Sequence, residues 1–103
     1  MLSQIRTSNK NREIVIELTR KFNLGAENII ARIAIGYSLQ AGDKFSPLDI
    51  KDSGGKEYSK NVLFGNYYQI YEALICTHYH INNNDKDLPR YFKMHLDAGL
   101  QRI

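Results

Sequence analysis

The stretch NLGAENIIARIAIGYSLQ, residues 23–40, decides the fold. Gly25 can adopt a positive φ angle, so it separates two helices by a short turn. After this turn, apolar residues repeat at helical spacing and predict a helix from about 26 to 40. Its first apolar face consists of Ile29, Ile30, Ile33, Ala34 and Tyr37. Ile35 and Leu39 extend the apolar surface to another side, so we expect this helix to lie centrally or at a subunit interface, with Ile35 and Leu39 as the subunit contact.

Small residues in the same helix predict close packing of its backbone against a neighbour. They are Ala31, Ala34 and Gly36. A glycine inside a helix costs roughly 1 kcal/mol relative to alanine, and close packing is the compensation we expect.

Upstream of the turn, Ser8 or Asn9 can cap a helix that extends to about Phe22. The segment before it, residues 2–8, alternates and predicts a short strand with Gln4, Arg6 and Ser8 on one side. So short a strand needs a partner, which is either another strand of the chain or the same segment of a second chain.

Downstream, Pro47 and the DSGG turn at 52–55 predict a loop or small hairpin over about 43–58. Residues 59–79 predict one helix, and a short last helix opens near Pro89 and ends before Gly99. The buried face expected for the 59–79 helix comprises Leu63, Tyr67, Ile70, Tyr71, Leu74 and Ile75. The predicted fold is mainly α, with a short N-terminal strand followed by about four helices. All 103 residues form a single domain, 1–103, in this prediction.

Several function classes lack support in the sequence. No apolar run reaches the roughly 18–20 residues that span a bilayer, so we expect no membrane association.

Cys76 is the only cysteine, which excludes an internal disulfide and favours a cytoplasmic setting. The CTHYH string at 76–80 places Cys76 and His80 on one helix face but His78 on another, so we expect no metal site. No catalytic pair or phosphate loop is recognisable, and we expect neither an enzyme nor a cofactor.

The net charge of +3 is concentrated at the N-terminus. Residues 1–32 hold six basic and three acidic side chains, which accounts for the whole excess, whereas later charges balance. The basic residues are Arg6, Lys10, Arg12, Arg20, Lys21 and Arg32. A solvated face and phosphate binding are about equally consistent with this pattern, and Lys44, Lys51, Lys56 and Lys60 are alternative cations.

Two resemblances add to this interpretation. The order of strand, helix, tight turn and helix over about 1–41 is similar to a ribbon-helix-helix DNA-binding unit. In that family two chains pair their N-terminal strands, and outward residues enter the major groove. The resemblance implies such a role for Gln4, Arg6 and Ser8.

The second resemblance covers nearly the whole chain. The segments RTS at 6–8, NLGAENIIARIAIGYSL at 23–39, DSGGKEY at 52–58 and HLDAGL at 95–100 resemble the DndE family. That family is the small subunit of bacterial DNA phosphorothioation systems, which replace a non-bridging phosphate oxygen of DNA with sulfur. The resemblance implies a non-catalytic homo-oligomer, expected to be a tetramer. It also implies that this oligomer binds double-stranded DNA through a basic surface, prefers nicked DNA and works with the other subunits of the system.

Three hypotheses follow. The first is a non-enzymatic DNA-binding subunit of the phosphorothioation machinery, in which Lys10, Arg12, Arg20 and Lys21 contact phosphates and Arg6 and Arg32 assist. The second is a ribbon-helix-helix repressor that recognises a specific operator through Gln4 and Arg6. The third is a protein-interaction adaptor whose basic end keeps it soluble. Sequence selectivity separates the first two, because a repressor prefers its site by roughly a thousandfold or more.

Overall fold

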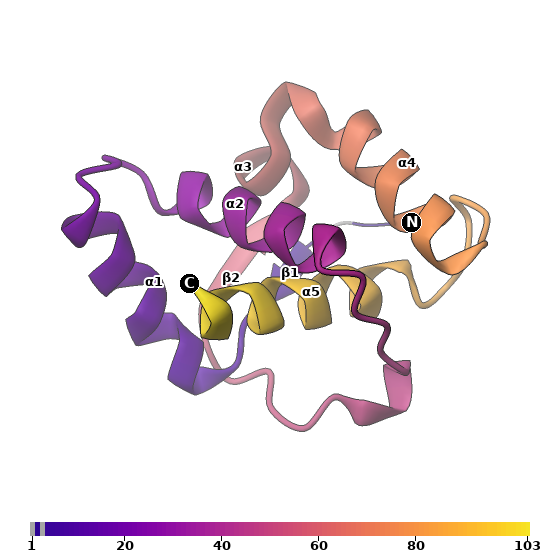
Figure 1. The fold of residues 1–103 in the computed structure, drawn as a ribbon, viewed down its shortest axis with the longest axis horizontal. Helices are drawn as coiled ribbons and strands as arrows, with labels where there is room; N and C mark the ends of the chain where they lie inside the picture. The colour runs from indigo at the N-terminus through magenta and orange to yellow at the C-terminus, as the bar shows by residue number, and fades with distance from the viewer. Residues whose placement is uncertain (1, 3) are drawn as a thin grey trace.

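The fold is mainly α, as predicted, and the computed structural model describes residue 2 and residues 4–103. The elements in chain order are β1 (Gln4–Arg6), α1 (Asn9–Lys21), α2 (Glu27–Gln40), the 3-10 turn η1 (Pro47–Asp49), β2 (Glu57–Ser59), α3 (Lys60–Phe64), the 3-10 turn η2 (Gly65–Tyr67), α4 (Tyr68–Tyr79) and α5 (Leu88–Arg102). Helices α2 and α5 lie side by side in the middle, with α1 and α4 at opposite ends (Figure 1).

The predicted N-terminal strand exists and pairs within the chain. β1 runs antiparallel to β2, and Ile5 lies opposite Tyr58 in this register. Both of these side chains are buried, whereas Gln4 and Arg6 are exposed. The partner of β1 is therefore a strand of the same chain, and not the second chain that a ribbon-helix-helix ribbon requires.

The turn between α1 and α2 forms as expected. The Ser8 side chain caps α1 by accepting a hydrogen bond from the Asn11 amide, and α1 ends at Lys21. Gly25 has φ = 83°, and α2 begins two residues later. The N-cap and the glycine turn are local signals, which is why the sequence places these helix ends correctly.

Close backbone packing occurs where α2 meets α5. A Cβ atom built on Gly99 would lie 2.8 Å from the Ala34 Cα and closer still to its carbonyl group. The prediction of close packing is thus confirmed at Ala34. It is wrong at Gly36, since a Cβ atom there would meet nothing within 4 Å.

The helix predicted over 59–79 is broken in the structure. Gly65, at φ = 56°, ends α3, and a 3-10 turn leads into α4. Residues before and after the break no longer share one helical face, so the predicted buried face is only partly correct. Leu63 and Ile75 are fully buried, but Tyr67, Ile70 and Leu74 are about half exposed.

The remaining segments differ from prediction in two ways. The 43–58 loop forms no hairpin of its own, because β2 pairs with β1. The last helix is longer than expected and continues past Gly99 to Arg102, since that glycine packs against α2 and does not end the helix.

The DSGG turn docks onto the start of α1. One Asp52 carboxylate oxygen accepts the Gly54 amide at 2.8 Å, and the other accepts the Asn9 amide at 2.9 Å. These two backbone hydrogen bonds, that from Gly54 first, lower the pKa of Asp52 below its ordinary value. The turn therefore has a structural role.

Candidate nucleic-acid interface

The side chains of the CTHYH string do not converge on a metal. His78 Nε2 lies 2.5 Å from the Asp43 carbonyl oxygen, and His80 ends α4 with φ = 56°. The pKa of the Cys76 thiol is raised, mainly by burial, so the thiol stays protonated. Within residue 2 and residues 4–103, no three His, Cys, Asp or Glu side chains gather as a metal site would need.

The structure reveals a buried hydrogen-bond network that sequence reasoning missed. Ser38 Oγ lies 2.8 Å from His95 Nδ1, and the Tyr79 hydroxyl lies 2.6 Å from His95 Nε2. The Phe45 amide donates to the Tyr79 oxygen, so we assign the Tyr79 proton to the bond with Nε2 and the imidazole proton to Nδ1. Ser38 and His95 are fully buried, so this network ties α2, α4 and α5 together without reaching a substrate.

Burial, and next the neighbouring His78, lower the pKa of His95 from 6.5 to about 4. In the unfolded chain the His95 imidazole is protonated as the pH falls through 6.5, whereas in the folded chain it is protonated only near pH 4. The stability that the neutral His95 contributes is therefore complete above pH 6.5 and is lost progressively as the pH falls from 6.5 to 4, by about 3 kcal/mol in all. Urea unfolding between pH 7.5 and 4 measures this loss. In a His95→Gln chain, the free energy of unfolding should change less steeply with pH than in the wild type. Equal slopes in the two chains would contradict the lowered pKa of His95.

The predicted DNA-contacting residues fall into two groups. Lys10, Arg12, Arg20 and Lys21 are exposed on α1. Among the residues the structure describes, none of these four forms an ion pair within 4.0 Å. Glu13 and Glu17 are exposed on the same helix, so the surface of α1 is basic but mixed. These four cations can approach phosphates without first breaking an ion pair.

Arg6 and Arg32 are occupied by contacts within the chain. An Arg6 guanidinium nitrogen lies 2.5 Å from Glu57 Oε1, across the β1–β2 pair. Arg32 Nε donates to the Leu63 carbonyl at 2.6 Å, and its guanidinium lies 5.5 Å from the Tyr67 ring centre. Their partners are far away in sequence, so no local signal could have identified these contacts.

The predicted subunit contact needs one correction. Ile35 is fully buried inside the chain, so it has no surface to offer a second subunit, and this part of the prediction is wrong. The helix is apolar on most sides, and periodicity alone could not tell which side faces the core. Leu39 is partly buried and lines a surface groove between α2 and α4.

Comparison with known proteins identifies a family and two similar folds. The family model described as DNA sulphur modification protein DndE matches residues 4–103. The fold is similar to the crystal structure of DndE from Escherichia coli B7A, a protein involved in DNA phosphorothioation modification. The TM-score is 0.82 and the identity 21%, over 99% of this chain and 97% of that one. It is also similar to a DndE G21/24K mutant involved in DNA phosphorothioation, with a TM-score of 0.79 and 23% identity over 99% and 98% of the two chains. Comparison with curated proteins gives no match.

Proposed function

Because the chain belongs to the DndE family of DNA sulphur modification proteins, we propose that it is a non-catalytic, DNA-binding subunit of the DNA phosphorothioation machinery. The family match over residues 4–103 carries this proposal. The unpaired cations of α1 supply a surface for it, and the proposal places the protein in the cytoplasm beside the other subunits of the system. Within the described residues, no helix is long and apolar enough to span a membrane.

The proposed mode of binding is electrostatic. Lys10, Arg12, Arg20 and Lys21 contact backbone phosphates and release counterions, while Arg6 and Arg32 assist only if their present contacts open. A single chain with a net charge of +3 attracts DNA only weakly. The proposal therefore includes a homo-oligomer, a tetramer in the simplest form. Assembly brings the basic surfaces of several chains onto one duplex.

The proposed preference is for nicked duplexes of any sequence. A nick makes the backbone flexible, and phosphate-directed contacts respond to shape and flexibility without reading bases. The repressor hypothesis has less support, because β1 pairs with β2 of its own chain and Arg6 pairs with Glu57.

Reversing two charges at the end of α1 tests the surface. An Arg20→Glu/Lys21→Glu chain should bind a duplex roughly tenfold or more weakly at about 50 mM salt, with a shallower salt dependence. Both side chains are exposed, so the fold and the oligomer should be unchanged. Fluorescence anisotropy with a labelled duplex measures the affinity.

The matched control carries the same change in charge on the 43–58 loop. Lys44→Glu/Lys51→Glu also reverses two exposed lysines, so it reports the effect of net charge alone. Equal losses in the two variants would show a non-specific charge effect. A larger loss in the loop variant would move the DNA surface to the loop.

A further inference from the structure

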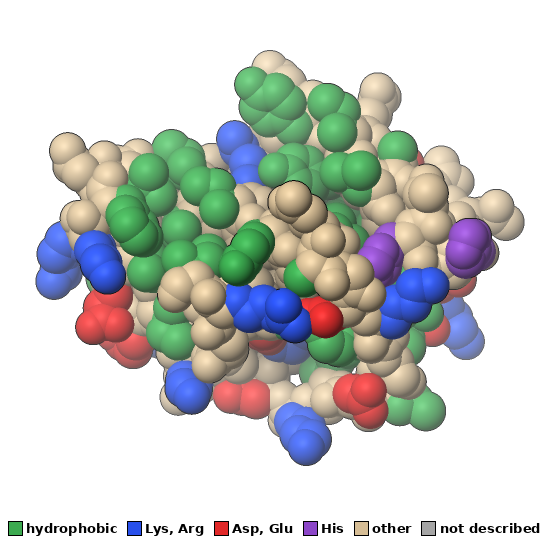
Figure 2. Space-filling view, viewed as in Figure 1, with side chains coloured by type: hydrophobic (Ala, Val, Ile, Leu, Met, Phe, Trp, Pro, Cys, Tyr) green, Lys and Arg blue, Asp and Glu red, His purple; other side chains and the backbone are tan. Residues whose placement is uncertain are grey.

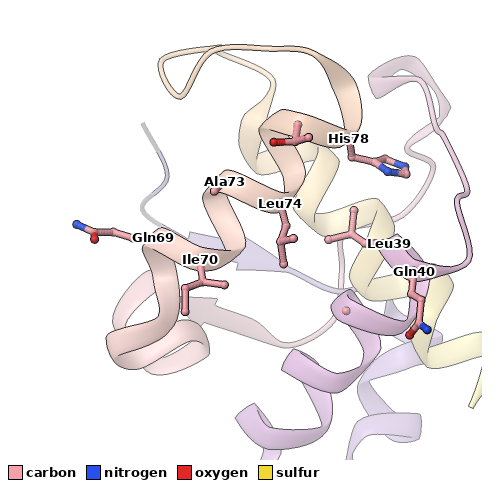
Figure 3. Close-up of a pocket in the computed structure, with 9 residues that line it drawn as sticks. Leu39, Gln40, Gln69, Ile70, Ala73, Leu74 and His78 are labelled. Carbon is pink, nitrogen blue, oxygen red and sulfur yellow. The ribbon is translucent and has the colours of Figure 1, made fainter.

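Two surface grooves of the chain differ in what they offer a partner. One, of about 770 Å³, lies between α2 and α4, where Figure 2 shows hydrophobic side chains and Figure 3 shows Leu39, Ile70 and Leu74 pointing into the space. None of the described residues that line it is a lysine, arginine, aspartate or glutamate, so nothing in it selects one kind of occupant. The other, of about 470 Å³, lies along β1 and combines a strand edge with cationic and apolar side chains. We call it the β1 groove.

The β1 groove follows the edge of β1 that faces away from β2. All three residues of β1 line it, whereas β2 contributes none of the described lining residues. Over the part of the chain that the structure describes, the sheet consists of these two strands, so this edge of β1 has no neighbouring strand. The opposite wall comes from the 47–53 segment and from the start of α5. Its residues are Pro47, Leu48, Ile50, Ser53, Pro89, Arg90 and Lys93.

The backbone groups on this edge lack a strand partner. The Thr7 amide donates at 2.9 Å to the carbonyl that directly precedes β2, which sets the alternation of the ladder. Because bonded pairs alternate in an antiparallel ladder, the backbone of Ile5 faces β2, and the amides and carbonyls of Gln4 and Arg6 point away from it. No turn, loop or side-chain hydrogen bond among the described residues uses these four groups. An extended segment can pair with them as a third strand.

The β1 groove is also cationic. Arg6, Arg90 and Lys93 line it, whereas none of its described lining residues is an aspartate or glutamate. Arg6 and Arg90 each pair with a carboxylate outside the groove, but both pairs are exposed. Exposed ion pairs contribute little, so these two arginines can turn to an incoming carboxylate at small cost. The groove therefore favours a ligand that carries negative charge.

The strand edge and the apolar lining favour a peptide over a nucleic acid. The carbonyls of Gln4 and Arg6 need donors, which a peptide supplies through its amides, whereas a phosphate backbone offers only acceptors. Leu48 is 88% exposed, and Ile50 is partly buried, so apolar side chains of a peptide would cover surface that phosphates leave in water. A second copy of β1 is disfavoured, because it would bring its own Arg6 against the cations of the groove.

We propose that the β1 groove binds an extended acidic segment of a partner protein, which adds to β1 as a third strand. Side chains alternate along a strand, so this segment places acidic residues beside Gln4 and Arg6 and apolar residues on the side of Ile5. The pattern that fits is acidic and apolar residues in alternation. This inference goes beyond the proposed DNA-binding function and does not depend on the cations of α1.

A fluorescein-labelled peptide of alternating glutamate and valine, about six residues long, tests the proposal on the full chain. Fluorescence anisotropy should show binding with a Kd of about 1 mM or lower, and a lysine–valine peptide of the same length should not bind. NMR should show that hydrogen exchange at the Gln4 and Arg6 amides slows about tenfold or more at saturating peptide, because these amides become hydrogen-bonded.

Two pairs of variants separate the strand edge from the charge. Gln4→Pro removes an amide that faces the groove and should weaken peptide binding about fivefold, whereas Gln4→Ala keeps the amide and should bind as the wild type does. Arg90→Glu should weaken binding about tenfold. Lys44→Glu makes the same change in net charge at an exposed position outside the groove and should leave binding unchanged. Circular dichroism checks that each variant is folded.

The outcomes separate this inference from the proposed function. Absence of peptide binding at about 1 mM, or equal affinities of the Gln4→Pro and Gln4→Ala chains, would overturn it. If Gln4→Pro does not fold, equal affinities of the Arg90→Glu and Lys44→Glu chains would overturn it instead. Slower exchange at Gln4 and Arg6 with a DNA duplex but not with the peptide would assign the groove to DNA and also overturn it. A chain that binds the peptide but no duplex would support the groove and contradict the DNA-binding proposal.

Discussion

A Gly99→Ala chain is expected to lose several kcal/mol of folding stability, on the order of 3 kcal/mol or more. The added methyl group would collide with the backbone of Ala34, and a backbone atom cannot rotate away as a flexible side chain can. Helices α2 and α5 would have to separate, and they form the most extensive contact in the fold. Since small domains have only about 5–15 kcal/mol in total, the midpoint of urea unfolding should fall sharply.

The control for this prediction is the same substitution in the facing helix. Gly36→Ala adds a methyl group where nothing lies within 4 Å, so it should stabilise the chain by up to about 1 kcal/mol through helix propensity. Both variants and the wild-type chain are unfolded at the same protein concentration. Equal effects of the two substitutions would contradict the close approach of α2 to α5 at Gly99.

The second large effect is expected at Asp97, which joins α5 to the start of α1. Its carboxylate pairs with Lys93, accepts the Asn11 side-chain amide at 2.8 Å and accepts the Ser8 amide at 3.1 Å. Lys93 is buried, so Asp97→Ala leaves a buried charge and the Ser8 amide without their partner, while the Asn11 amide keeps only its bond to the Asp97 carbonyl oxygen at 3.2 Å. We expect a loss of about 3–5 kcal/mol, measured by urea unfolding at pH 7.

A double variant distinguishes the cost of a lone charge from a loss of packing. Lys93→Met with Asp97→Asn removes both charges and keeps similar shapes, so it should recover most of the stability lost in Asp97→Ala. Arg90→Ala serves as the surface comparison, because Arg90 is exposed and 3.9 Å from Asp87, and should cost less than about 1 kcal/mol. If Asp97→Ala costs no more than Arg90→Ala, the buried ion pair is not important for stability.

Local signals in the sequence predicted the first half of the fold well. The Ser8 cap, the Gly25 turn and the apolar repeat placed α1 and α2 to within a residue or two. Each signal acts within a few positions along the chain. The break at Gly65 was missed because an apolar repeat continues across it, and only tertiary packing decides whether a glycine bends or ends a helix.

Burial was harder to predict than helix position. Ile35 and Ile70 carry similar side chains on apolar helices, yet Ile35 is fully buried and Ile70 is 60% exposed. Periodicity identifies apolar faces but does not say which neighbour covers each one. The His95 network was missed for a related reason, since Ser38 and His95 are 57 positions apart.

The candidate DNA surface was predictable in part. Exposure of the α1 cations follows from their positions opposite the apolar stripe of an amphipathic helix. The contacts of Arg6 and Arg32 were not predictable, because Glu57 and the Leu63 carbonyl reach them only through tertiary structure. Of the six cations predicted to contact phosphate, four therefore lie exposed on α1 without an ion pair among the described residues.

The most direct test of the proposed function is a salt titration of binding to two labelled duplexes of the same arbitrary sequence, one intact and one with a single nick. We expect affinity to fall steeply with salt and binding to be tighter on the nicked duplex, because phosphate contacts dominate and a nick adds backbone flexibility. Equal weak binding to both would contradict nick recognition and reopen the repressor hypothesis. Absence of binding to either duplex at low salt would contradict the DNA-binding role and favour an adaptor.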